Sequence, residues 1–327
     1  MSVGEWRGLP ETSAVLEVRH AVRGWVSRYA PNGVVAVGLS GGADSLALTA
    51  GAVAEAGVVD ALVVDHGLQE GSEGVAAEAA ERALGLGCRS ARVLAVEVSG
   101  PGGMEAAARR ARYAALDAAR DGLPVLLGHT LDDQAETVLL GLGRGSGGRS
   151  LRGMAEFADP WGRPLLGVRR DVTRRLCADL GLTPYEDPHN SAPEFTRVRL
   201  RTEVLPLLEE VLGGGVAPAL ARTAEQLRAD GAVLDELAER LLHEADDGAG
   251  LSIETLATAP AALRLRAVRA WLLAGGAKAL TDKHLRAVDA LVTDWHGQGG
   301  VAVGGGTPGT RLVATRKHGR LTLGLAP

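Results

Sequence analysis

One glycine-containing segment has the residue types expected of a loop that binds an anion. Residues 37–48 read VGLSGGADSLAL, in which a valine-rich stretch leads into Ser-Gly-Gly and then into an apolar, helix-like stretch. Glycines let the backbone approach an anion closely, and the N-terminus of the following helix directs N–H groups at it. Hydroxyl groups add further donors. The residues of this expected phosphate-binding loop are Ser40, Gly41, Gly42, Ala43, Asp44 and Ser45.

Asp44 distinguishes this loop from the common phosphate loop, in which a lysine contacts the terminal phosphates. Phosphates repel a neighbouring carboxylate unless a cation lies between them, so Asp44 predicts a bound Mg²⁺. The alternative is a plain strand-to-helix turn in which Asp44 and Ser45 cap the helix. The strand–loop–helix context favours phosphate binding.

A second segment, GHTLDDQAETVLL, places three carboxylates within five residues. On a helix, Asp133 and Glu136 are neighbours at i+3, and Asp132 and Glu136 are neighbours at i+4. Like charges at these spacings are mildly destabilising, so the group predicts a positively charged partner. The alternative is a helix start in which Thr130 caps the helix and Asp133 closes a capping box.

Glu105, Arg109 and Arg112 lie at i, i+4 and i+7, on one helical stripe. They could form surface ion pairs, each of which contributes only about 0.2–0.5 kcal/mol to helix stability. Alternatively, Arg112 could stabilise negative charge that develops in a reaction.

Further arginines occur in local groups. The net charge of −5 gives no overall attraction for phosphates, so any nucleic-acid surface must be a local patch. On a strand, Arg197, Arg199 and Arg201 would share a face, whereas on a helix they would point in different directions. The other groups are Arg144, Arg149 and Arg152; Arg264, Arg266 and Arg269; and Arg311, Arg316, Lys317 and Arg320.

The elements that must position these residues alternate along the first half of the chain. Short, continuous apolar runs predict strands, and alanine-rich segments between them predict helices, a pattern typical of a parallel sheet covered on both faces. Ligands of such sheets bind beyond the carboxyl ends of the strands, where these candidate residues fall. The expected strands are 34–40, 61–67, 92–99 and 124–130, and the expected helices are 48–57, 73–86, 104–122 and 132–143.

The second half predicts a helical region. Residues 204–245 indicate long helices interrupted at Gly213–Gly215 and at Pro218, and a further helix follows Pro260. The glycine-rich stretch 141–154 indicates a flexible loop, and the segment after Val301 indicates a small β element. We therefore expect a catalytic domain over residues 1–215 and a smaller, mostly helical domain over 216–327.

Composition excludes several classes of protein. The chain has 327 residues, of which 46% are hydrophobic and 23% charged, as in ordinary globular proteins. The two cysteines, Cys88 and Cys177, are far apart, which excludes a disulfide scaffold and a four-cysteine zinc site. No apolar run reaches ~18 residues and no secretory signal is visible, so we expect a cytosolic protein without a membrane segment.

Five ordered motifs resemble the tRNA(Ile)-lysidine synthetase family of the PP-loop, or N-type ATP pyrophosphatase, superfamily. SGGADS resembles the superfamily's pyrophosphatase loop. The motifs specific to the family, over residues 33–210, are VDHGLQ, EAAARRARY, HTLDDQAET, GRGSGGRSLRGM and EDPHNSAPEFTRVRLRTEVLPLL. The resemblance implies a doubly wound, mainly parallel α/β fold, Rossmann-like and similar to the adenine nucleotide alpha hydrolases.

The resemblance also implies the reaction and its participants. ATP with Mg²⁺ would adenylylate the wobble cytidine of an isoleucine tRNA with a CAU anticodon, and the amine of free L-lysine would then displace AMP. Asp133 and Glu136 would bind the lysine, Asp44 the metal ion, and Arg112 would lie near the intermediate. His129 and Asp132 are candidate bases or organisers. The implied tRNA-binding residues are Arg144, Arg149, Arg197, Arg199 and Arg201, and a homodimer is compatible with the sequence.

Three other functions are compatible with parts of the sequence. A tRNA thiolase of the same superfamily would require sulfur-handling cysteines, which are usually paired. An ammonia-dependent ligase for a small molecule would not require the arginine groups. A non-catalytic RNA-binding module would not require Asp44, Asp133 and Glu136 together.

Overall fold

The computed structural model describes residues 9–67, 69, 71–100, 103–145, 147–187, 195–307 and 309–326. Two compact units make up the chain: residues 1–145 with 150–224, and residues 146–149 with 225–327. The division falls within one long helix, α9 (Val216–Ala245). The expected domain boundary after residue 215 stays a prediction.

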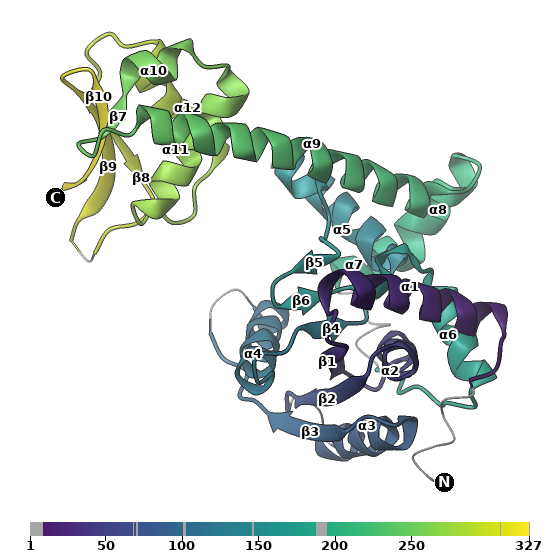
Figure 1. The fold of residues 1–327 in the computed structure, drawn as a ribbon. Coiled ribbons are helices and arrows are strands. Elements are labelled where there is room, and N and C mark those ends of the chain that lie inside the picture. The colour runs from purple at the N-terminus through teal and green to yellow at the C-terminus, as the bar shows by residue number, and fades with distance from the viewer. Residues whose placement is uncertain are drawn as a thin grey trace. The chain divides into compact units, whose positions relative to one another are not determined.

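The first unit contains a six-stranded sheet in the order β3-β2-β1-β4-β6-β5 (Figure 1). All neighbouring strands pair in parallel except β5, which is antiparallel to β6. The sheet confirms the expected mainly parallel α/β class. Its strands are β1 (Val34–Leu39), β2 (Val58–Asp65), β3 (Ser90–Ala95), β4 (Val125–Leu127), β5 (Phe157–Ala158) and β6 (Trp161–Gly162).

Helices cover both faces of this sheet, as expected for a doubly wound fold. One core joins the sheet to α1, α2, α3 and α6, and a separate core joins it to α4. The helices are α1 (Ser13–Tyr29), α2 (Ala43–Glu55), α3 (Ser72–Leu86), α4 (Met104–Ala119), α5 (Leu131–Gly143), α6 (Arg170–Asp179), α7 (Thr196–Arg199) and α8 (Leu205–Val211). Short helical turns occur at Gly148–Leu151, Pro164–Gly167 and Leu200–Val204.

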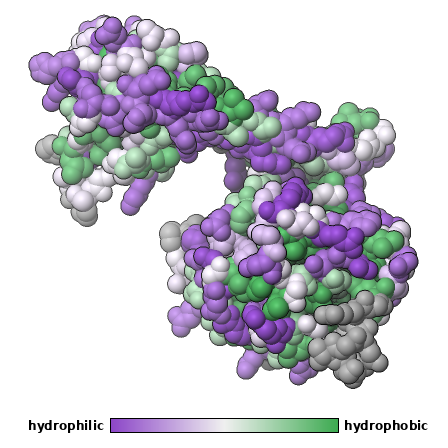
Figure 2. All heavy atoms as spheres, in the orientation of Figure 1, coloured by the Kyte–Doolittle hydropathy of each residue, from purple (hydrophilic) through white to green (hydrophobic). Residues whose placement is uncertain are grey.

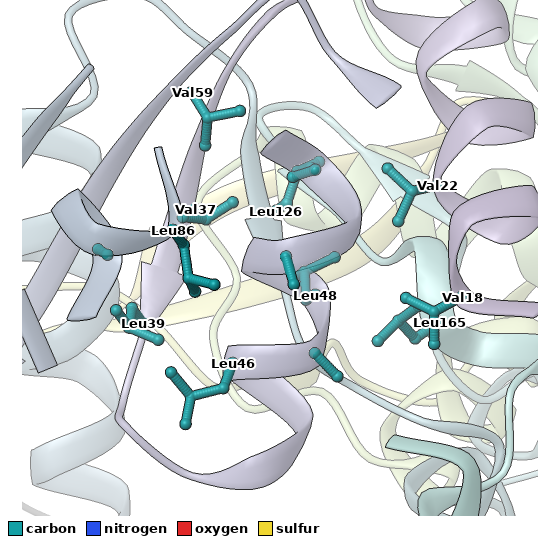
Figure 3. Close-up of a cluster of buried hydrophobic side chains, with 14 of the residues drawn as sticks. Val18, Val22, Val37, Leu39, Leu46, Leu48, Val59, Leu86, Leu126 and Leu165 are labelled. Atoms are coloured by element: carbon teal, nitrogen blue, oxygen red, sulfur yellow. The ribbon is translucent and has the colours of Figure 1, made fainter. Parts of the chain in front are cut away.

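The larger core consists mainly of valine, leucine and alanine side chains, together with the fully buried Trp25 of α1. Leu46 and Leu48 of α2 are fully buried and lie among valines of α1 and β1 (Figure 3). Deleting a buried leucine side chain costs about 2–5 kcal/mol of stability, so this contact fixes α2 firmly on the sheet. The start of α2 is therefore held in place against the end of β1.

Several local expectations differ from the structure. The strands expected at 61–67 and 92–99 are β2, at Val58–Asp65, and β3, at Ser90–Ala95. Strand β4 ends at Leu127, because Gly128 and His129 already lead into the cap of α5. The expected break at Pro218 is wrong: Pro218 lies in the first turn of α9, where a helix has no acceptor for the missing N–H. Parts of the stretch 141–154 are regular rather than a flexible loop, since α5 continues to Gly143 and residues Gly148–Leu151 form a helical turn.

The second unit contains an antiparallel sheet in the order β7-β10-β9-β8, packed against helices. Its apolar core includes Leu251, Leu256, Leu272 and Leu321, all fully buried. The elements are β7 (Leu251–Ser252), α10 (Ile253–Thr258), α11 (Ala261–Ala274), α12 (Asp282–Thr293), β8 (Val301–Val303), β9 (Arg311–Lys317) and β10 (Arg320–Ala326). The β element expected after Val301 thus provides three of the four strands.

Within the described residues, no single helix is long and apolar enough to cross a membrane, although the bent pair Thr196–Val211 and Val216–Ala245 passes the same test of length and composition. The view in Figure 2 shows hydrophilic residues predominating along α9 and apolar residues scattered among polar ones elsewhere.

Candidate functional site

The segment Ser40–Ser45 forms the tight turn after β1 and the first residues of α2, which begins at Ala43. Gly41 has a φ of 80°, in the left-handed region that glycine adopts without strain. The Ser45 hydroxyl accepts from the Ser40 N–H and donates to the Gly42 carbonyl, at 3.2 and 2.9 Å. Because the first N–H groups of α2 have no partner within the helix, this turn presents donors suited to a phosphate.

Gly128 brings the end of β4 directly against this turn. A Cβ atom at Gly128 would lie 2.9 Å from the Asp44 carbonyl carbon and 3.0 Å from the Ser45 nitrogen. Such distances are shorter than real Cβ contacts, so only glycine allows the approach. The close contact brings the carboxylates that follow β4 next to the phosphate-binding loop.

The start of α5 is a capping box, as one interpretation of the sequence predicted. The Thr130 hydroxyl accepts from the Asp133 N–H, and Oδ2 of Asp133 accepts from the Thr130 N–H at 2.8 Å. The cap does not use all the carboxylate oxygens at the start of α5. Oδ1 of Asp133 and the carboxylate of the fully buried Glu136 remain for other contacts. The capping and charge-binding interpretations therefore both describe this helix.

Arg170, at the start of α6, supplies the positive charge that the carboxylates require. Its Nη2 lies 2.6 Å from Oδ1 of Asp133, its Nη1 3.3 Å from Oε1 of Glu136, and its Nε 3.5 Å from Oδ2 of Asp44. The Arg170 N–H also donates to Asp132, at 2.8 Å. One guanidinium thus joins the phosphate-binding loop to the acidic helix.

The sequence interpretation did not include Arg170. A signal for it was present, because Arg169 and Arg170 begin a helix, where the helix dipole disfavours positive charge. Arg169 binds the other oxygen of Asp132, at 3.0 Å. Both oxygens of Asp132 therefore contact the start of α6.

Arg201 also contacts this group, from a segment remote in sequence. Its Nε lies 2.8 Å from Oε1 of Glu136, so the buried Glu136 carboxylate has two arginine partners. Arg199 points elsewhere and pairs with Glu203 in an exposed i,i+4 contact. The helical alternative for Arg197, Arg199 and Arg201 is therefore the one observed.

Burial and neighbouring charges set the ionisation of these groups. Burial raises the pKa of Asp44 above its usual value, although Thr173 and Arg170 favour the charged form. Burial also opposes the charged form of Asp133, yet Arg170 and the Thr130 N–H hold its pKa below the usual value. For Arg170, burial opposes the charge, but the adjacent carboxylates raise the pKa, so the guanidinium stays charged.

A second polar group of the candidate site consists of His66, His129 and Arg112. Burial lowers the pKa of His129 to about 3 and also lowers the pKa of Arg112. Within the described residues, His66 Nδ1, His129 Nδ1 and Arg112 Nε are buried without a hydrogen-bond partner. Buried polar atoms normally have partners, so these atoms indicate a site for a polar ligand.

A cavity of about 660 Å³ connects these groups. It brings the predicted loop together with the acidic helix, whereas the predicted tRNA-binding arginines, apart from Arg201, do not line it. Glu136 and Asp132 contact it only through the arginines they bind. The predicted residues that line it are Ser40, Gly42, Ala43, Asp44, Ser45, Arg112, His129, Asp133 and Arg201.

The remaining arginines occupy varied positions. Arg144 is exposed, and Arg149 pairs with Asp235 at 2.6 Å. Arg264 is buried and pairs with Asp289 at 2.6 Å, so it is not part of a surface cluster. His189 and Asn190, which belong to the last of the five motifs, lie outside the described residues, as do Leu68 and Ser146 of two others.

The donor set fits Mg²⁺ only together with a bound nucleotide. Among the residues described by the structure, no group of three or more His, Cys, Asp or Glu side chains could hold a metal ion. Mg²⁺ is usually held by one or two carboxylates plus substrate phosphates, and Asp44 provides such a carboxylate beside the loop. These residues therefore fit a metal ion that binds with the phosphates.

Comparisons with known proteins agree with this architecture. A family model described as a PP-loop domain matches residues 16–208, and one described as a TilS substrate binding domain matches residues 251–322. The tRNA(Ile)-lysidine synthase of Nocardia farcinica is 75% identical over 308 residues, covering 94% of this chain and 97% of that protein. The enzyme of the same name from Rhodococcus erythropolis is 69% identical over 316 residues, covering 97% of each.

Among solved structures, the U34-tRNA thiolase NcsA from Methanococcus maripaludis, with its 4Fe-4S cluster, superposes with a TM-score of 0.54. The two chains are 18% identical, and the match covers 66% of this chain and 80% of the other. At this identity the likeness concerns the fold alone.

Proposed function

The chain belongs to the tRNA(Ile)-lysidine synthase family, and we propose that it joins free L-lysine to the wobble cytidine of an isoleucine tRNA with a CAU anticodon. In this reaction the cytidine carbonyl oxygen first attacks the α-phosphorus of ATP and releases pyrophosphate. The lysine amine then forms a bond to the activated carbon, and AMP leaves. The observation that supports the proposal is the juxtaposition of the Ser40–Ser45 loop with the acidic start of α5, since Asp44 and Asp133 line one cavity.

We assign the triphosphate to the Ser40–Ser45 loop. The N–H groups at the start of α2 and the serine hydroxyls would hold the phosphates. Asp44 would hold Mg²⁺, which when bound would offset the phosphate charge and favour attack at phosphorus. Arg112 lies at the same cavity with an unsatisfied Nε, which suits it to the negative charge that develops on the adenylylated cytidine.

We assign the lysine side chain to Asp133 and Glu136. Both carboxylates already bind guanidinium groups in this structure, so their surroundings accept a cation. The amine must lose its proton before it attacks the activated carbon. His129 is held neutral by burial, which favours an orienting hydrogen bond over proton storage, and Asp132 is engaged by α6, which favours a structural role.

The tRNA, the oligomeric state and the compartment are further parts of the proposal. Arg144, Arg149, Arg197 and Arg199 would contact phosphates of the tRNA, whereas Arg201 contacts Glu136 and would act within the cavity. We expect a cytosolic enzyme and a homodimer, which sedimentation equilibrium tests. Exposed apolar side chains at the end of α8 support the dimer: Leu207, Val211 and Leu212.

The experiment that tests this function is mass analysis of the wobble nucleoside. The purified chain is incubated with ATP, Mg²⁺, L-lysine and an isoleucine tRNA transcript that carries CAU. We expect a nucleoside heavier than cytidine by one lysine less one water, and pyrophosphate release that requires both lysine and tRNA. A methionine tRNA with the same anticodon serves as the control. Release that ignores tRNA would favour a small-molecule ligase, and release that requires tRNA but ignores lysine would favour a thiolase.

A further inference from the structure

Arg170 occupies the position between the two substrate sites of the proposed reaction. Its three guanidinium nitrogens each face a different carboxylate, Asp44 on the nucleotide side and Asp133 and Glu136 on the lysine side. The Arg170 side chain is 15% exposed and Glu136 is 0% exposed, so solvent screens these contacts only weakly. The charge of Arg170 is therefore shared between two sites that receive different ligands.

The contacts of Arg170 on the lysine side duplicate those that a lysine ammonium would make. Oδ1 of Asp133 and Oε1 of Glu136 are the oxygens that Arg170 binds. An incoming ammonium group must share these oxygens with Arg170 or displace it, and in either case it shares Oε1 of Glu136 with Arg201, whose Nε lies 2.8 Å away. The shortest contact of Arg170 is with Asp133, at 2.6 Å, so the competition is direct.

On the nucleotide side, Arg170 lines the same cavity as the phosphate-binding loop. A triphosphate bound there would keep a net negative charge even with one Mg²⁺ at Asp44, and a guanidinium binds phosphate oxygens in the same forked geometry as carboxylates. Bound nucleotide would therefore draw Arg170 away from Asp133 and Glu136.

We propose that Arg170 is a positioning residue that couples nucleotide binding to lysine binding. Before nucleotide binds, Arg170 holds the lysine-binding carboxylates in place and satisfies their charge. When nucleotide binds, Arg170 moves toward the phosphates, and Asp133 and Glu136 become able to accept the lysine ammonium. This inference rests on the proposed function, and it requires that nucleotide strengthen the binding of lysine.

The test measures lysine affinity by titration calorimetry on the full chain, with and without the magnesium complex of α,β-methylene-ATP. This analogue resists cleavage between the α and β phosphates, so it reports binding alone. For the unmodified chain we expect the analogue to tighten lysine binding about 10-fold, within the usual range of coupling between sites. Linkage requires that lysine tighten binding of the analogue by the same factor, which provides an internal check.

Variants at position 170 assign the coupling to this side chain. In Arg170→Gln, lysine affinity should become the same with and without the analogue. Arg170→Lys keeps the charge but loses the forked guanidinium that contacts three carboxylates at once. The ratio of lysine affinities with and without the analogue should therefore lie between that of the unmodified chain and that of Arg170→Gln. Arg175→Gln is the matched control, because Arg175 lies on the same helix and its ion pair with Asp171 is exposed. Its ratio of lysine affinities with and without the analogue should equal that of the unmodified chain.

The outcomes separate this inference from the proposed function. If the unmodified chain makes no lysidine, the proposed function fails. If it makes lysidine but binds lysine equally with and without the analogue, only the coupling is overturned. The coupling by Arg170 is likewise overturned if Arg170→Gln, or Arg170→Lys where the glutamine variant does not fold, keeps the full ratio. A purely structural role would change melting temperature and leave the ratio unchanged.

Discussion

Substitution of Gly128 by alanine tests how closely the phosphate-binding loop depends on its contact with β4. The added Cβ would lie 2.9 Å from the Asp44 carbonyl carbon, whereas ordinary contacts of Cβ atoms begin at 3.4 Å. Either the start of α2 or the end of β4 must therefore move by about 0.5 Å. Gly128 does not have a left-handed backbone, so this contact alone determines the cost. Overpacking of this kind costs about 1–3 kcal/mol.

The overpacking can weaken either the affinity for ATP or the free energy of unfolding, so both quantities are measured. If the loop moves, affinity for ATP should fall by roughly 5- to 150-fold, because ~1.4 kcal/mol corresponds to a factor of ten. If the loop keeps its position, the free energy of unfolding should fall by the same energy. Titration of a fluorescent ATP analogue and urea denaturation measure the two quantities.

The control is Gly85→Ala, since Gly85 lies in α3 and a Cβ there would meet no atom within 4 Å. Alanine in an open helical position should stabilise the protein by about 0.5–1 kcal/mol and leave ATP affinity unchanged. The reasoning is refuted if Gly128→Ala changes both ATP affinity and unfolding free energy no more than this control does.

Four other predictions follow from the site. Asp44→Ala should abolish turnover while circular dichroism shows an intact fold; ordinary activity would contradict the Mg²⁺ assignment. Glu136→Gln should raise the KM for lysine at least about 10-fold, as loss of a charged partner implies; an unchanged KM would reassign Glu136 to structure. His129 has a pKa of about 3 when folded and 6.5 when unfolded, so the unfolded state binds more protons between these values and stability should fall as pH decreases from 6.5 toward 3. His129→Asn should flatten that decrease in urea denaturation at several pH values. Burial raises the pKa of Cys88 to about 12 and of Cys177 to about 11, so iodoacetamide at pH 8 should modify neither in the folded chain and both in urea, as mass spectrometry would reveal.

The sequence was sufficient to predict the main elements of the fold because buried parallel strands are continuous apolar runs. The valine-rich segments at β1 and β2 illustrate this, and the loop after β1 was identified from Ser-Gly-Gly followed by a helix. Strand β4 was harder to delimit, since its three residues are followed by a glycine and a cap rather than by further apolar residues. Pro218 was misinterpreted because a proline is compatible both with the first turn of a helix and with the end of one. The residue type alone does not distinguish the two positions.

The candidate site was predictable where its residues lie near one another in sequence or follow adjacent strands. Asp44 follows β1 and Asp133 follows β4, and these strands are neighbours, so their carboxyl ends meet. Arg170 and Arg201 come from segments 37 and 65 residues beyond the carboxylates that they bind. Local periodicity carries no information on such pairs. The spacing of the like charges predicted that the carboxylates of α5 need a positively charged partner. It did not predict which residue provides that charge.

The capping box at the start of α5 has a consequence for substitution. Asp133 divides its two oxygens: Oδ2 completes the cap with Thr130, and Oδ1 binds Arg170. Asparagine has the same shape but only one acceptor. With its oxygen toward Thr130 it would point an amide NH₂ at the guanidinium, and rotated the other way it would set two donors face to face at the cap. No neutral side chain of this shape satisfies both Thr130 and Arg170. A substitution of Asp133 that weakens the cap of α5 therefore also weakens the binding of a cation, and the two properties change together.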